Sequence, residues 1–98
     1  VISGEYAESQ ENAVLKLKFE SKRVFLVMRT TDGATKSVRV TLNENPLTPQ
    51  HAGENTLNGV VTVSKDMLYE LINLPEPGIH TLELYFDRGI EIFAFTFG

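Results

Sequence analysis

The sequence contains no cysteine and no tryptophan, and its apolar runs are short. The absence of cysteine excludes disulfides, thiolate metal sites and dithiol redox chemistry within these residues. The longest apolar run, residues 24–28, is far shorter than the roughly 18 residues of a membrane-spanning helix, so we expect no membrane insertion by this domain. The chain starts at Val1 without a signal peptide, and we expect it to be a segment excised from a larger protein.

Basic residues are outnumbered, with nine Lys and Arg against thirteen Asp and Glu and a net charge of -4. Binding to nucleic acid or to anionic lipid depends on a clustered basic surface, so we expect neither partner. The length of 98 residues and the hydrophobic fraction of 42% are typical of one globular domain. We therefore expect residues 1–98 to form a single domain.

Alternation of apolar and polar side chains is the main structural signal. In residues 13–20 the odd positions are apolar and the even ones mostly charged, which on a strand places one set inward and the other toward water. The same pattern recurs in residues 37–42, 81–86 and 92–97. In the last segment it predicts Phe93, Phe95 and Phe97 on the core face, with Ile92, Ala94 and Thr96 opposite.

Further strands and turns complete the pattern. Residues 24–28 are apolar throughout, as in a strand covered on both faces, and residues 60–63 form a shorter candidate. Residues 68–72 fit either a strand or one turn of helix. Asp32-Gly33 predicts a tight hairpin, because both residues tolerate positive φ. The remaining breaks are predicted in the proline-containing residues 43–46 and 74–78, in a long loop over residues 47–59 and at residues 87–89.

About seven to nine short strands with almost no helical periodicity predict an all-β fold of two packed antiparallel sheets. We therefore expect an antiparallel β-sandwich of the jelly-roll kind.

Several segments resemble one domain family. The closing residues 89–98 are similar to its "G-x-x-x-[YF]-A-F-T-F-G" ending, and residues 78–84 to its "G-x-H-T-L-x-L" strand. Residues 23–28 resemble "R-x-V-F-L-V-M", and residues 67–72 resemble "R-L-Y-x-L-V" with Met67 in place of the basic residue. Tyr6 also stands where the family often has tyrosine. The family is the C-terminal domain of bacterial thioredoxin-like proteins of the DipZ type, which are related to cytochrome c biogenesis proteins.

The resemblance implies a non-catalytic accessory domain with a jelly-roll fold like that of carbohydrate-binding modules. It implies that the parent is an extracytoplasmic (periplasmic) thiol–disulfide oxidoreductase, whose Cys-x-x-Cys motif lies in an upstream thioredoxin-like domain of the same chain. That upstream domain is one expected partner and a carbohydrate is the other. The matching positions are mostly apolar, glycine or turn residues, so they indicate fold and ancestry better than activity.

Catalysis would require a nucleophile, a base and an orienting acid. The two histidines are His51 and His80, and Ser64 with Asp66 is the one nucleophile–acid pair that suggests itself. No glycine spacing typical of a nucleophile elbow supports this pair, so we predict no catalytic residue. His80 is expected to form a local hydrogen bond at a strand end.

The acidic residues of the predicted turns do not form a recognisable metal-ligand set. Related jelly rolls often hold a structural calcium, but turn acids are usually solvated. We predict no metal site and no cofactor from the scattered acids, which are Asp32, Glu44, Glu54, Asp66 and Asp87.

Carbohydrate binding is the sharper functional hypothesis. Sugars pack on an exposed aromatic face flanked by polar groups, and with no tryptophan available Tyr85 is the best platform, because it lies on the polar face of its strand. Tyr6 and Tyr69 are weaker candidates. The predicted hydrogen-bonding residues on the same face are Lys16, Lys18, Arg39, Thr41 and Glu83. The alternative is that Tyr85 simply half-buries against a neighbouring strand.

The second hypothesis is a structural or interaction domain. It would pack on the thioredoxin-like domain or on a second copy of itself through an exposed apolar surface. Val14, Val61 and Ile92 are the candidate residues for this surface.

Overall fold

The structure is a computed structural model that describes residues 7–8 and 13–98. Every regular element in these residues is a strand, which confirms the predicted all-β class. No helix in the described part is long and apolar enough to cross a membrane. The strands are β1 (Ala7–Glu8), β2 (Ala13–Thr30), β3 (Lys36–Leu42), β4 (Asn45–Pro46), β5 (Thr56–Leu57), β6 (Val60–Val63), β7 (Met67–Phe86) and β8 (Ile90–Phe97).

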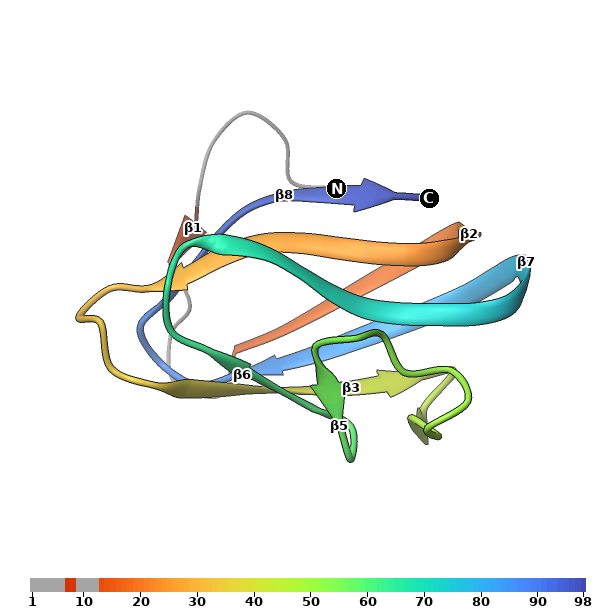
Figure 1. The fold of residues 1–98 in the computed structure, drawn as a ribbon, viewed down its shortest axis with the longest axis horizontal. Helices are drawn as coiled ribbons and strands as arrows, with labels where there is room; N and C mark the ends of the chain where they lie inside the picture. Colours follow the sequence, from red (N-terminus) through yellow and green to blue (C-terminus); the bar gives the residue numbers. More distant parts are fainter. Residues whose placement is uncertain (1–6, 9–12) are drawn as a thin grey trace.

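All strands join one antiparallel sheet in the order β1-β8-β2-β7-β3-β6-β5, with β4 paired to β3. The long strands β2 and β7 bend midway, so the sheet folds into two facing layers (Figure 1). The first layer contains β8 with residues 24–30 of β2 and 67–73 of β7. The second layer contains β3 and β6 with residues 13–21 of β2 and 78–86 of β7.

The bend occurs where the β2–β7 register shifts. Ser21 pairs with Gly78 and Arg23 with Asn73, which leaves residues 74–77 without ladder partners on β2. Proline lacks an N–H, so Pro75 and Pro77 cost no ladder hydrogen bond here. Residues 74–78 were predicted to separate two strands. This prediction is wrong, because they form a bend within the single strand β7. Residues 68–72, left open between strand and helix, belong to the same strand.

The predicted Asp32-Gly33 hairpin is also wrong, because residues 24–30 of β2, which precede it, lie in the first layer, whereas β3 lies in the second layer and does not pair with β2. Gly33 adopts positive φ (76°), but Asp32 does not, and its carboxylate accepts the Ala34 N–H at 3.0 Å. This hydrogen bond lowers the pKa of Asp32, with a smaller contribution from the Lys36 ammonium. The tight turn of this region instead lies at Asn43 and Glu44, whose φ values are 52° and 67°, between β3 and β4.

The core lies between the layers, and a bulge in β8 changes which residues enter it. Val27 pairs with Ala94 but Met28 with Ile92, so Phe93 is the extra residue and the alternation reverses there. Ile92 is consequently buried. Phe93 instead lies under the Arg29 guanidinium, 5.3 Å from its ring centroid.

The core-face prediction is therefore wrong for Phe93 and for Ile92. The prediction holds for Phe95, which packs against the core, but it is also wrong for Phe97, which is 40% exposed at the end of the strand.

A buried carboxylate fixes the loop over residues 47–59. Glu70 of β7 is 5% exposed and accepts hydrogen bonds from Arg23 Nε (2.6 Å) and from the Glu54 N–H (2.7 Å). The Glu70 N–H in turn donates to Asn55 Oδ1 at 2.8 Å. The loop backbone approaches β7 so closely that a Cβ on Gly53 would lie 2.4 Å from the Glu70 carbonyl oxygen.

We predict that Gly53→Ala destabilises the domain by about 2 kcal/mol or more, because rigid backbone atoms would have to move. Urea unfolding measures this change. Gly78→Ala is the matched control, since its Cβ would meet only the His80 side chain, at 3.0 Å. Equal losses of stability in the two variants would contradict the tight approach at Gly53.

Candidate functional site

Two neighbouring rows of side chains cross the outer face of the second layer. Directly paired residues on antiparallel strands project to the same face, so each row is contiguous. The first row consists of Val14, Tyr85 and Arg39, and the second of Lys16, Glu83 and Thr41. Leu84, which lies between the two rows on β7, and Leu82, on the other side of Glu83, are fully buried, as the alternation predicts.

Arg39 stacks on Tyr85. The guanidinium carbon lies 4.1 Å from the centroid of the tyrosine ring, which is a cation–π contact. Tyr85 is half-buried and Arg39 is exposed. One face of the predicted aromatic platform is therefore covered by a cation.

Glu83 is held by its two neighbours in the second row. Its carboxylate lies 3.5 Å from Lys16 Nζ and 3.5 Å from Thr41 Oγ1, which donates to it. Glu83 is only 9% exposed. A carboxylate this buried needs such partners, so Lys16 and Thr41 stabilise its charge as well as adding polar groups to the face.

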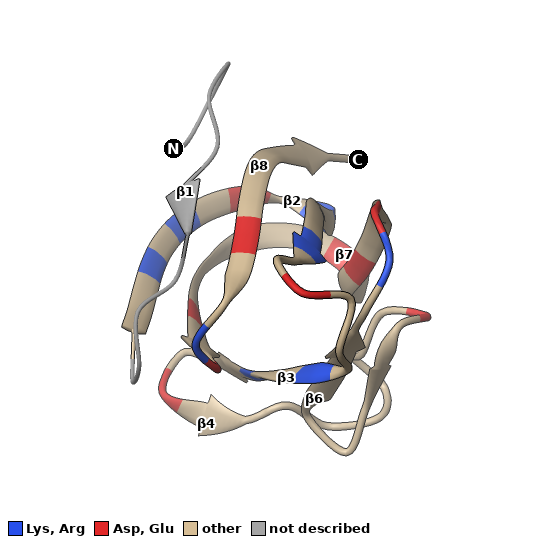
Figure 2. Cartoon of the chain, turned by 90° about the vertical axis from the view of Figure 1, so that its left-hand side faces the viewer, with Lys and Arg blue, Asp and Glu red and all other residues tan. Residues whose placement is uncertain are grey.

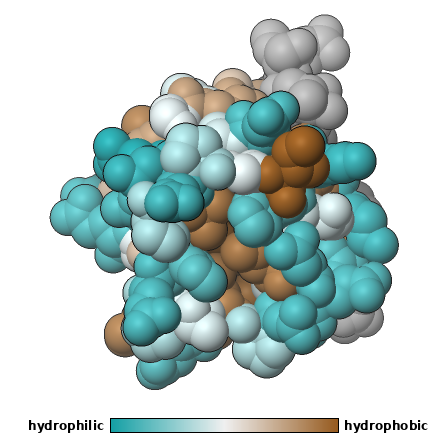
Figure 3. Space-filling model, turned by 90° about the vertical axis from the view of Figure 1, so that its right-hand side faces the viewer, coloured by the Kyte–Doolittle hydropathy of each residue, from teal (hydrophilic) through white to brown (hydrophobic). Residues whose placement is uncertain are grey.

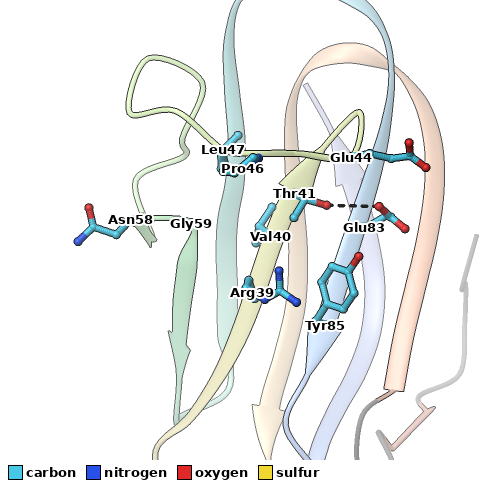
Figure 4. Close-up of a pocket in the computed structure, with 10 residues that line it drawn as sticks. All are labelled: Arg39, Val40, Thr41, Glu44, Pro46, Leu47, Asn58, Gly59, Glu83 and Tyr85. Atoms are coloured by element: carbon cyan, nitrogen blue, oxygen red, sulfur yellow. Dashed lines mark hydrogen bonds between the residues drawn. The ribbon is translucent and has the colours of Figure 1, made fainter.

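These residues open into a hollow of about 520 Å³, here called the outer hollow (Figure 4). Its full lining is Arg39, Val40, Thr41, Glu44, Pro46, Leu47, Asn58, Gly59, Glu83 and Tyr85. A second hollow of about 320 Å³ also contacts Arg39 and Tyr85, together with Val14 and Val60. The stacked pair therefore stands where the two hollows meet.

The structure brings together Arg39, Thr41, Glu83 and Tyr85 from the predicted site, and Lys16 joins them through Glu83. Lys18 is exposed and pairs with Thr81 two positions further along β2, outside the lining of the hollow. The predicted hydrogen-bonding residues therefore share one face, but their role in binding stays a prediction.

The two weaker tyrosine candidates have different outcomes. Tyr69 is 3% exposed, and its hydroxyl donates to the Lys65 carbonyl at 2.7 Å and accepts the Ser64 N–H at 3.2 Å. It therefore offers no face to a ligand, and that candidate is wrong. Tyr6 lies outside the described residues.

Sequence reasoning missed the loop wall of the outer hollow. Leu47, Asn58 and Gly59 come from the segment predicted only as a long loop. Glu44 comes from the β3–β4 turn and Pro46 from β4. Positive φ at Asn58 (53°) and Gly59 (76°) marks the tight turn between β5 and β6. The Asn-Gly dipeptide between two short apolar segments was the available signal for this turn.

The histidines lie in separate local contacts. His51 Nδ1 is 3.2 Å from Thr48 Oγ1, and His80 Nδ1 is 2.8 Å from Asn43 Nδ2. Within residues 13–98 neither ring pairs with a carboxylate or with Ser64. No three His, Asp or Glu side chains in the described part gather as metal ligands would.

The bent antiparallel sheet defines a jelly-roll β-sandwich, and solved structures share this fold. A family two carbohydrate esterase from Clostridium thermocellum in complex with cellohexaose matches all of the chain (100%) with a TM-score of 0.69 and 16% identity. A second esterase of that family, from Cellvibrio japonicus, matches 97% of the chain with a TM-score of 0.62 and 13% identity. The chain spans only 30% and 29% of these two esterases.

The sequence model of the family described as "Thioredoxin like C-terminal domain" matches residues 1–98, and the chain belongs to this family. No curated protein matches the chain in sequence.

We predict that the Arg39–Tyr85 contact has a measurable coupling energy of about 0.5–1 kcal/mol, as expected for an exposed cation–π pair. A double-mutant cycle with Arg39→Ala and Tyr85→Ala, followed by urea unfolding, measures it. The control cycle combines Arg39→Ala with Phe93→Ala in the other layer, where we expect no coupling. Additive effects in the first cycle would show that the stack does not hold Arg39 in place.

Proposed function

We propose that this chain is a non-catalytic accessory domain that binds a carbohydrate or a related ligand in the outer hollow. The parent in this proposal is an extracytoplasmic thiol–disulfide protein of the DipZ type, related to cytochrome c biogenesis proteins. Because these residues contain no cysteine, the dithiol chemistry of such a parent would lie in its upstream thioredoxin-like domain.

The observation that carries the binding proposal is the composition of the outer hollow. An aromatic ring, a guanidinium, a hydroxyl and a carboxylate from two adjacent strands converge on a space of about 520 Å³. Small-molecule sites typically have volumes of roughly 300–1,000 Å³ and combine apolar walls with a few fixed polar groups. Pro46 and Leu47 supply apolar wall opposite the polar row.

The parent and its location rest on the family. Membership in the thioredoxin-like C-terminal domains supports an upstream domain of that kind in the same chain. The DipZ type and the extracytoplasmic location follow from the sequence resemblance. Reading the coding sequence directly upstream tests this part: a thioredoxin-like domain with Cys-x-x-Cys supports it, and an unrelated domain overturns it.

We predict that titration with cellohexaose at millimolar concentration shifts the backbone amide signals of Arg39, Thr41, Glu83 and Tyr85. This oligosaccharide is the first probe because it is in complex with an esterase that shares this fold over 30% of its length. The shifts should be lost in Tyr85→Ala, since this residue lines both hollows. Polysaccharides of cell walls, including acidic ones, complete the panel.

Phe93→Ala is the matched control for this titration. Its ring also lies under an arginine, but on β8 in the first layer. If no glycan in the panel produces localised shifts, the binding proposal fails. Shifts that survive in Tyr85→Ala but disappear in Phe93→Ala would place the ligand on the wrong layer.

A structural or interaction role is the second candidate, favoured by apolar side chains at the end of the molecule where β2 and β7 bend. Ile79 is 61% exposed there and Phe97 lies nearby at the end of β8. Figure 3 shows exposed apolar groups on this side among hydrophilic ones. Of the surface predicted from sequence, Val14 is exposed, but Val61 and Ile92 are buried in the core and cannot contribute.

If this end binds a partner domain, Ile79→Ser with Phe97→Ser should weaken association of the domain with the parent's thioredoxin-like domain, or with itself, by at least tenfold. Sedimentation of the mixed and separate domains measures this association. Leu57→Ser on β5, also highly exposed, is the control that should leave it unchanged. A strictly monomeric domain without affinity for its neighbour would rule this role out.

A further inference from the structure

The outer hollow contains Arg39, a cation without an ion pair to any acid in the part of the chain that the structure describes. Lys16, Arg23, Arg29 and Lys36 each lie within ion-pair distance of a carboxylate. Arg39, in contrast, has no carboxylate within that distance among residues 13–98, and its guanidinium instead contacts the neutral Tyr85 ring. A cation–π contact orients the guanidinium but leaves its charge and its N–H donors available.

The acids that line the hollow do not compensate for Arg39. Glu83 is already engaged by Lys16 and Thr41. Glu44 stands on the β3–β4 turn, and Figure 4 shows its carboxylate directed away from Arg39. Figure 2 shows acidic and basic positions interspersed along the strands. Asp87 lines the second hollow, where its carboxylate accepts the Ser37 N–H at 2.8 Å. Among the residues that line the outer hollow, Arg39 is therefore the one positively charged group.

From this arrangement, and resting on the proposed function, we propose that the ligand is an acidic sugar whose carboxylate is bound by Arg39. A guanidinium has planar, paired donors that match a carboxylate in a bidentate geometry. The Tyr85 ring holds that fork in place, so less side-chain entropy is lost when the carboxylate binds. A neutral sugar, in contrast, would have to displace Arg39 from the ring face that the guanidinium covers.

The net charge of -4 opposes an anionic ligand, but it acts over a longer range than the site does. At physiological ionic strength charges are screened over about 8 Å, so remote acids contribute little at the hollow. The guanidinium would contact the carboxylate directly in a partly desolvated space, where an ion pair is screened less. The local cation therefore decides the preference.

Trigalacturonic acid and its fully methyl-esterified form separate charge from shape, because they differ only in the carboxyl groups. Calorimetric titration of the wild-type domain should show binding of the acid at least tenfold tighter than binding of the ester, and addition of salt should weaken it. Equal affinities for the two forms, or binding of cellohexaose alone, would overturn the acidic-sugar assignment and leave the proposed carbohydrate function standing. No binding of any glycan would overturn both.

The variants test Arg39 itself. Arg39→Gln should weaken binding of the acid about tenfold to a hundredfold, since a hydrogen bond to a charged group is lost, with little effect on the ester. Arg39→Lys should recover only part of the affinity, because an ammonium lacks the bidentate fork. Lys65→Gln, which removes one charge beyond the opposite end of β6, should leave affinity unchanged.

Amide spectra establish that each variant is folded, and the acid–ester comparison on the wild type does not depend on any variant. Unchanged affinity in Arg39→Gln would contradict the assignment. Tighter binding of a sulfated trisaccharide than of trigalacturonic acid would point to a different anion and overturn the carboxylate specificity.

Discussion

The pairing of β2 with β7 on both sides of a shared bend is the constraint on which the architecture depends. Each strand contributes one half to each layer, so the two layers are continuous and cannot slide past one another. The bend concentrates its irregularity in residues 74–77, where the prolines need no ladder partner. β3 pairs with residues 82–86, in the C-terminal half of β7. The same constraint therefore sets which side chains of β3 and β7 lie beside each other in the outer hollow.

The Arg23–Glu70 ion pair extends this constraint to the loop. A carboxylate that is 5% exposed is costly unless its oxygens are paired, and both are paired here, one with Arg23 and the other with the Glu54 N–H. The loop held by these contacts runs on to Asn58 and Gly59, which form one wall of the outer hollow. An ion pair in the first layer therefore helps to shape the surface of the second, although no residue of the pair lines that surface.

Much of this arrangement is visible in local sequence, and the remainder depends on distant partners. The alternation in residues 13–20 and 81–86 correctly predicted which side chains face outward, because period two is a property of one strand. The reversal at Phe93 was not predictable, since a bulge exists only relative to the register of β2. The hairpin predicted at Asp32-Gly33 is wrong for a similar reason. The dipeptide is typical of a hairpin turn, but the strands on its two sides, β2 and β3, pair with other strands. Glu70 was not predicted as a buried carboxylate, because its partner Arg23 is 47 residues away.

The chemistry of the outer hollow follows from how Tyr85 is covered. In the absence of tryptophan, a tyrosine ring is the available platform for a sugar face, but a guanidinium already lies 4.1 Å above it. The guanidinium of Arg39 thus covers the apolar ring face with a positive charge. The neighbouring Glu83 does not pair with this guanidinium, because its carboxylate already interacts with Lys16 and Thr41. Selectivity at this face would therefore come from charge and donor geometry more than from stacking. The same aromatic residue would then act mainly by holding Arg39 in position.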